Sequence, residues 1–136
     1  MRGYRGKYYA ILKRIKERLI RCFGENLLSL VVFGSVARGT FSPESDIDIL
    51  VIVEDYESSR REYVRFFECV DEAVEINPVI IKRTQLRESL WFLWDCEFIV
   101  LYDREGFFEK FAEGLRKVME SRVIRRKGKM PYYEVL

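Results

Sequence analysis

The chain has 136 residues, of which 49% are hydrophobic and 34% are charged, and it contains no histidine. That size and composition predict one globular domain, 1–136, and no apolar run approaches the roughly 18 residues that cross a bilayer, so we expect a cytoplasmic protein with no membrane partner. The lack of an imidazole excludes Ser-His and Cys-His hydrolases and His-ligated metal enzymes, which leaves carboxylates, hydroxyls, Lys, Arg or a metal for any chemistry.

The net charge of +2 conceals two basic ends and an acidic middle. Residues 1–21 carry eight Lys or Arg and one acid, residues 116–129 carry seven and one, and residues 22–115 carry nine basic and nineteen acidic side chains. Solvated helix faces explain such ends better than nucleic-acid binding does, since helix surfaces are usually charged. Asn and Gln together number only three, a bias that suggests a thermophilic source.

The cysteines give no sign of a disulfide framework. Cys22, Cys69 and Cys96 are odd in number and widely separated, and without histidine they make a poor zinc site. Buried thiols are therefore expected.

The first predicted element is an amphipathic helix, and two buried strands follow it. From Tyr8 to Phe23 apolar residues recur every three or four positions, which is the helical period. Leu27–Phe33 and Ile47–Val53 are apolar runs of strand length. The loop between them is too short for a crossover helix, so these strands are expected to be antiparallel or part of a mixed sheet.

The second half of the chain alternates helices and strands. Ser59 and Glu62 form a capping-box pattern that begins a helix over 59–73. Pro78 lies in the next predicted strand, 74–81, and favours an edge position or the end of the strand, because proline donates no ladder hydrogen bond. The other predicted elements are a helix over 84–94, a strand over 98–102, a last helix capped by Asp103, and a basic C-terminal tail, 125–136, in which poor order is expected. This order predicts an α/β (α+β) domain, a small mixed sheet of about four strands flanked by helices.

A Gly-Ser pair directly after the first strand is the first candidate for chemistry. Gly34 and Ser35 leave backbone N–H groups free at the start of a helical turn, where a phosphate oxygen is favoured. Arg38, one turn further on, can reach the same anion. A plain turn with no ligand is the alternative for these residues.

A pair of aspartates at the start of the second strand is the other candidate. Asp46 and Asp48 are two positions apart, so on a strand their side chains share one face. Two such carboxylates repel each other unless a cation lies between them, and Mg²⁺ is the cation that takes one or two carboxylates together with phosphate oxygens. The alternative is an ordinary loop end at Ser45-Asp46, with Asp48 exposed to solvent on an edge strand.

Taken together, Gly34-Ser35, ten residues, and then Asp46-x-Asp48 between apolar residues resemble the signature of the DNA polymerase β-like nucleotidyltransferase superfamily. Ala37-Arg38-Gly39 and Ser45 look like its minimal, single-domain prokaryotic branch, the antitoxin-type partners of HEPN-domain proteins. The resemblance covers about 20 residues of motif, and the order of strands and helices agrees with it through Ile81.

The resemblance implies a site and a reaction. Asp46 and Asp48 would ligate two Mg²⁺ ions, Gly34, Ser35 and Arg38 would hold the phosphates of ATP, and a third carboxylate on a later strand would bind the metal beside the acceptor. The best match for that third acid is Glu75, with Asn77 facing the same way. Asp71 or Glu72 nearer the site, and Glu75 as a plain surface residue, are the alternatives left open.

Two functional hypotheses follow from these residues. The first is a Mg²⁺-dependent nucleotidyltransferase that moves AMP from ATP to a hydroxyl acceptor, for which the resemblance suggests a tyrosine of a partner HEPN toxin. The second is a catalytically weak or inactive antitoxin or adaptor that binds its partner without chemistry. A homo-oligomer is left open, and nucleic acid is the least favoured partner.

Overall fold

The structure, a computed structural model, describes residues 2–39, 45–86, 97–126 and 132–135. Three short 3-10 turns, Gly24–Asn26, Arg83–Gln85 and Arg104–Gly106, join longer elements within these ranges. The longer elements, in chain order, are α1 (Arg2–Phe23), β1 (Leu27–Phe33), α2 (Ser35–Arg38), β2 (Ile47–Val53), α3 (Ser59–Cys69), β3 (Ile76–Lys82), β4 (Ile99–Asp103), α4 (Phe107–Arg122), β5 (Val123–Arg126) and β6 (Tyr132–Val135).

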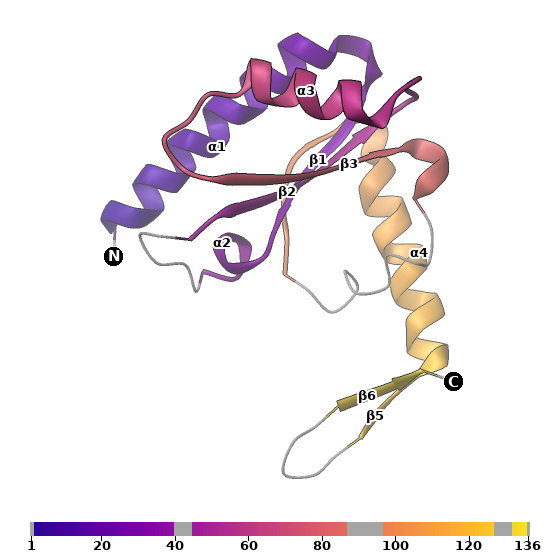
Figure 1. The fold of residues 1–136 in the computed structure, drawn as a ribbon. Coiled ribbons are helices and arrows are strands. Elements are labelled where there is room, and N and C mark those ends of the chain that lie inside the picture. The colour runs from indigo at the N-terminus through magenta and orange to yellow at the C-terminus, as the bar shows by residue number, and fades with distance from the viewer. Residues whose placement is uncertain (1, 40–44, 87–96, 127–131, 136) are drawn as a thin grey trace.

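The main sheet has four strands in the order β3-β2-β1-β4. β1 is antiparallel to both of its neighbours, whereas β2 and β3 are parallel and are joined through α3 (Figure 1). The predicted mixed sheet is confirmed, and so are the antiparallel pairing of the first two strands and the edge position of the strand that contains Pro78.

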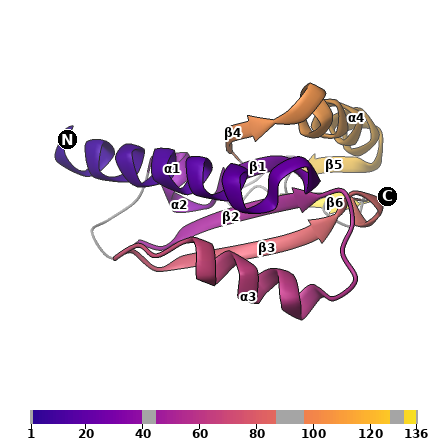
Figure 2. The same cartoon turned by 90° about the horizontal axis from the view of Figure 1, so that it is seen from above.

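The two faces of the sheet are covered by different helices. Along β2, Ile49 and Val51 pack with residues of α1 and α3, whereas Leu50 and Ile52 belong to a second cluster that contains Phe108 of α4. This alternation is the period of two expected of a strand that is buried on both faces. α1 and α3 lie side by side, and α4 lies away from them near β4 and β1 (Figure 2).

A disulfide joins the two neighbouring helices α1 and α3. Cys22 and Cys69 are bonded, with 6.5 Å between their Cα atoms. The expectation of buried free thiols was therefore wrong for this pair, because packing brings together two cysteines that are 47 residues apart in sequence. Cys96 lies outside the described residues.

The boundaries of α3 and the cap of α4 test the predicted helix signals. The N-cap of α3 is Ser58, whose hydroxyl accepts a hydrogen bond from the Arg61 N–H at 3.3 Å, so the predicted Ser59–Glu62 capping box was one residue late. α3 also ends at Cys69 rather than near residue 73. Asp103 was identified correctly, since its carboxylate accepts the backbone N–H groups of Phe108 and Glu109 at 2.8 and 3.1 Å.

Two further predictions concern the chain after β3. A 3-10 turn ends at Gln85 and Leu86 is not helical, and the rest of the predicted helix over 84–94 lies outside the described residues. In the tail, where no element was predicted, β5 and β6 form an antiparallel pair. None of the described helices is long and apolar enough to span a membrane.

Candidate active site

The candidate site lies where one end of each of β1, β2 and β3 meets the others. Because β1 and β2 are antiparallel, Gly34 at the end of β1 lies beside Asp46 and Asp48 at the start of β2. Because β2 and β3 are parallel, the start of β3 lies on the other side of the same aspartates. In the register of the sheet Asp48 is opposite Phe33 on β1 and opposite Asn77 on β3. Pairing thus brings together residues that are far apart in sequence.

Gly34 is in direct contact with the second aspartate. Its φ of 79° lies in the region that favours glycine, and a Cβ at this position would collide with the Asp48 Oδ2. The Gly-Ser turn and the aspartate pair are therefore two parts of one site, because the carboxylate occupies the space that a side chain at Gly34 would need.

The short helix α2 fixes the turn that follows Gly34. Val36 is buried and anchors it, and Gly39, at a φ of 74°, ends it by donating its N–H to the carbonyls of Ser35 and Val36. The first N–H groups of a helix have no acceptor within the helix, so those at Ser35 and Val36 are suited to an anion. Arg38 is the last residue of α2.

The two aspartates share a hydrogen-bonding partner, Asn77. Its amide nitrogen lies 3.1 Å from the Asp46 Oδ2 and 3.4 Å from the Asp48 Oδ1. Both carboxylates are half-buried, and this amide lies against both of them. Rotation of the amide by half a turn would present its oxygen instead, which is a ligand that Mg²⁺ accepts.

Glu75, the predicted third carboxylate, is hydrogen-bonded to the start of β2 through its backbone. Its carbonyl oxygen accepts the N–H of Ile47 at 2.9 Å, and its side chain is exposed. Among the residues that the structure describes, no three Asp, Glu, Cys or His side chains are grouped so that they could hold a metal ion. The role of Glu75 as a metal ligand therefore stays a prediction, and the residue found on both aspartates is Asn77.

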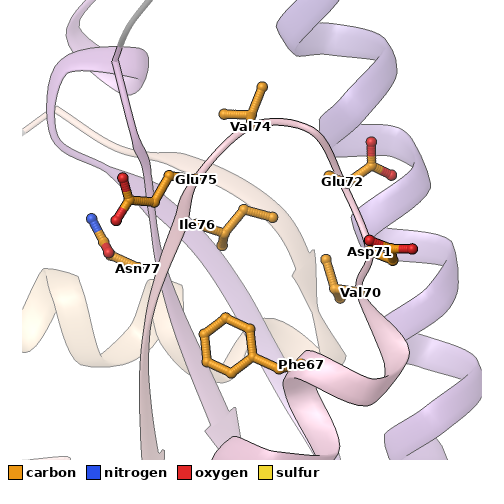
Figure 3. A pocket seen from close by; sticks show the side chains of 8 residues that line it. All are labelled: Phe67, Val70, Asp71, Glu72, Val74, Glu75, Ile76 and Asn77. Carbon is orange, nitrogen blue, oxygen red and sulfur yellow. The ribbon is translucent and has the colours of Figure 1, made fainter.

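A pocket of about 450 Å³ lies beside Glu75 and Asn77 at the β3 edge of the sheet. Figure 3 shows these two side chains on the strand side of the pocket, with Asp71 and Glu72 on the side of α1. Phe67 forms part of the wall and is 55% exposed. The pocket is therefore an aromatic and acidic recess next to the aspartate pair. The remaining lining residues are Val70, Val74 and Ile76.

Of the two acids offered as alternatives to Glu75, Glu72 is paired with α1. The guanidinium of Arg14 donates two hydrogen bonds to its carboxylate, at 2.8 and 3.1 Å. These bonds hold the pKa of Glu72 below its ordinary value, against a smaller opposite effect of burial. A carboxylate held in this way ties the end of α3 to α1 and is not free to turn toward Asp46.

The donor set fits a hard cation. The described part of the site offers two carboxylates and one amide and contains no sulfur or imidazole ligand, which suits Mg²⁺ better than zinc or copper. With two carboxylates on one face, bound phosphate and water would complete an octahedral shell.

The chain is similar in sequence to known nucleotidyltransferases. A family model described as a nucleotidyltransferase domain matches residues 12–122. A protein of Methanocaldococcus jannaschii named as a protein adenylyltransferase is 26% identical over 121 residues, which are 81% of this chain and 82% of that one.

Two solved structures show the same fold. One is a toxin–antitoxin structure with AMP-PNP, with a TM-score of 0.54 and 19% identity over 78% of this chain and 87% of the other. The second is a tri-AMPylated HEPN toxin of Shewanella oneidensis in complex with its MNT antitoxin, with a TM-score of 0.51 and 15% identity over 81% and 87%.

Proposed function

Because the chain belongs to the nucleotidyltransferase domain family, we propose that it transfers AMP from ATP to a hydroxyl group of a partner protein. The observation that carries this proposal is the contact of three segments at one end of the sheet: Gly34 lies against Asp48, and Asn77 is bonded to Asp46 and Asp48. A phosphate-binding turn, a pair of metal-binding carboxylates and a third polar position are the parts that this reaction needs.

The order of the strands matches the order of groups in the reaction. The phosphate-binding turn follows β1, Asp46 and Asp48 lie at the start of β2, and Glu75 and Asn77 lie on either side of the first residue of β3. In-line substitution at phosphorus requires the attacking and leaving oxygens on opposite sides of the α-phosphorus. Pyrophosphate would therefore leave over Ser35 and the end of β1, and the acceptor hydroxyl would enter from the β3 side.

The chain's own residues would divide the work as follows. Asp46 and Asp48 hold the cation, and Ser35 and the backbone at Gly34, together with Arg38, hold the β- and γ-phosphates. When bound, two Mg²⁺ ions would neutralise charge on the triphosphate and on the leaving oxygen. The acceptor oxygen forms a bond to the α-phosphorus as the bond to the β-phosphate oxygen breaks, and pyrophosphate departs.

Asn77 and Glu75 would have different tasks on the acceptor side. Asn77 orients both aspartates, to which it is bonded. Glu75 lines the pocket with an exposed carboxylate and would take the proton of the acceptor hydroxyl. Glu75 thus takes part in the reaction as a base, whereas Asn77 supports the two metal-binding carboxylates.

The proposed acceptor is a tyrosine of a HEPN-domain toxin. Support comes from the AMPylated HEPN toxin in the related complex and from the name of the archaeal relative. The pocket at the β3 edge adds a physical reason, because the exposed ring of Phe67 can pack against an aromatic acceptor while acids at the opposite wall face its hydroxyl or a basic neighbour.

A test combines ATP labelled at the α-phosphate, Mg²⁺ and a purified HEPN-domain toxin. Label should pass to the HEPN protein, and Asp46→Asn with Asp48→Asn should abolish transfer and Mg²⁺-dependent ATP binding. The matched control, Glu57→Gln with Glu68→Gln, removes two exposed acids, one shortly before α3 and one within it. This control should leave transfer and ATP binding unchanged. Transfer that survives the double Asn variant contradicts the proposal.

One observation favours the second candidate, an antitoxin that neutralises its partner without chemistry. In the described part of the chain no third carboxylate joins the aspartate pair. That function predicts stoichiometric neutralisation of the toxin without ATP, and it predicts that Asp48→Asn neutralises as well as the unchanged protein. Dependence of neutralisation on ATP and on Asp48 would exclude it.

A further inference from the structure

A second groove lies between α1 and β4, away from the aspartates. Its volume is about 480 Å³, and it runs along two turns of α1 and the first half of β4. Most of its lining is apolar, and two lysines stand along the helix side. The lining residues are Tyr9, Leu12, Lys13, Lys16, Ile99, Val100 and Leu101.

Large apolar side chains in this groove are open to solvent. Tyr9 is 75% exposed and Ile99 is 38% exposed, and both are among the few large hydrophobic residues that the described structure leaves uncovered. Their exposure costs free energy in water, so contact with an apolar group would be favourable.

The lysines of the groove differ from the neighbouring arginine of the same helix. Arg14 is paired with Glu72, whereas neither Lys13 nor Lys16 has an acidic partner in the part of the chain that the structure describes. Two unneutralised cations beside an apolar floor favour a ligand that is both acidic and apolar.

The other wall of the groove is the edge of the sheet. Within the described residues β4 pairs with β1 alone, so one side of its backbone has no strand beside it. A strand in that position presents alternate N–H and C=O groups that another extended chain can pair with. A polypeptide backbone can pair with the whole row of these groups.

We propose that this groove binds an extended, acidic and apolar segment of a protein partner, which lies along β4 as an added strand. Its apolar side chains would cover Tyr9 and Ile99, and its carboxylates would meet Lys13 and Lys16. The identification of that partner with the acceptor protein rests on the proposed function, but the docking surface itself does not.

The position of the groove suits a docking site that is separate from the reaction site. Leu101 packs on the α1 face of the sheet, whereas Asp48 shares the opposite face with Leu50 and Ile52. Strands are about 4.8 Å apart, so β4 and β2 are separated by about 10 Å, and one partner domain can contact both places. Docking would raise the local concentration of the acceptor hydroxyl at the aspartates.

The test uses short random peptides displayed for selection against the intact protein, without ATP or metal. We expect enrichment of sequences that combine acidic and apolar residues. A synthetic copy of an enriched peptide should bind on the order of tenfold more weakly to Lys13→Glu with Lys16→Glu. The matched control, Lys110→Glu with Arg116→Glu, makes the same charge change on α4 and should bind the peptide as before.

Three further measurements distinguish strand addition from a purely electrostatic contact and from binding at the aspartates. Hydrogen exchange at the amides of Ile99–Asp103 should slow when the peptide binds. Tyr9→Ala should weaken binding too, and it serves as the second variant if charge reversal impairs folding. Asp46→Asn with Asp48→Asn should leave peptide binding unchanged, so failure of the proposed transferase activity does not count against the groove.

Several outcomes would overturn the proposal. They are no enrichment of acidic peptides, equal binding to the charge-reversed variant and the control, or unchanged exchange in β4. Displacement of the peptide by ATP, with weaker ATP binding by the charge-reversed variant, would instead assign the groove to the nucleotide.

Discussion

The two sides of the candidate site are built by different kinds of interaction. On the β1 side Gly34 touches Asp48 directly, and the residues responsible are close in sequence. On the β3 side Asn77 lies about thirty residues further along the chain and reaches the aspartates because β2 and β3 pair in parallel. A disulfide and the Arg14–Glu72 ion pair fix α3 and the residues that follow it to α1. The first side is therefore specified locally, and the second depends on tertiary packing.

The largest expected effect comes from breaking the local side. Gly34→Ala places a Cβ against the Asp48 carboxylate, so Mg²⁺-dependent ATP binding should fall by more than about a hundredfold. The strained φ should also lower the free energy of unfolding by about 1–3 kcal/mol. Gly24→Ala is the control, because Gly24 has a φ of 56° and open space around it, so it should show the strain without the loss of ATP binding. Urea unfolding and calorimetric titration measure the two quantities, and equal ATP binding by both variants would contradict the assigned contact.

The packed side is tested next by removing its covalent link. Cys22→Ser with Cys69→Ser opens a loop with a sequence separation of 47, and loop closure of that size contributes about 2–4 kcal/mol to stability. Thermal unfolding should shift to lower temperature in the variant and in reduced wild-type protein by the same amount. An unchanged melting temperature would show that packing alone holds α3 to α1.

Substitutions of Asn77 and Glu75 separate metal binding from proton transfer on the β3 side. Asn77→Ala removes the bonds to both aspartates and should weaken Mg²⁺ or Mn²⁺ binding about 10–100-fold, as loss of a supporting partner does at other metal sites. Asn77→Asp adds a carboxylate and should tighten it. Glu75→Gln should change the rate of transfer and its pH dependence more than metal affinity. The reverse result, strong metal dependence on Glu75 alone, would restore it as the third ligand.

The smallest effect concerns pH and the Arg14–Glu72 pair. The pKa of Glu72 is lowered in the folded protein, so the pair stabilises the fold above the unfolded pKa of this group, and the contribution is lost as pH falls through the folded pKa. Arg14→Gln should therefore destabilise the protein slightly at neutral pH. The difference from wild type should shrink as the pH falls below the ordinary pKa of a glutamate. A difference that persists at low pH would assign the loss to packing of the Arg14 side chain.

The same contrast accounts for which parts of the fold could be predicted from the sequence. The bounds of β1 and β2 agree with the predicted runs because each strand is buried and its apolar residues are continuous. The start of α3 at Ser59 was predicted correctly, but its cap was misplaced by one residue, because Ser58 and Ser59 are equally able to cap and only the backbone geometry selects between them. The disulfide was not predicted because the spacing of two cysteines in the sequence does not show which helices pack together.

The candidate site follows the same division. Gly34, Ser35, Asp46 and Asp48 are recognisable from residue type and spacing, and the structure brings them together. Glu75 rather than Asn77 was predicted to be the third metal ligand because a carboxylate is the usual residue at that position. Only the register of β2 and β3, which sets Asp48 opposite Asn77, shows which side chain reaches the pair. The alternation of Glu75 and Asn77 on one strand face was the signal available.

The contact between Gly34 and Asp48 has a consequence for how such proteins vary. The site requires a glycine, with no room for a side chain, that faces a carboxylate on the neighbouring strand. The number of residues that separate the two is not part of that requirement. Insertions or deletions between the strands should therefore be tolerated wherever the strand pairing survives, while a residue larger than glycine should be excluded. Searches for related sites would gain by fixing the glycine and the aspartates and allowing the interval between them to change.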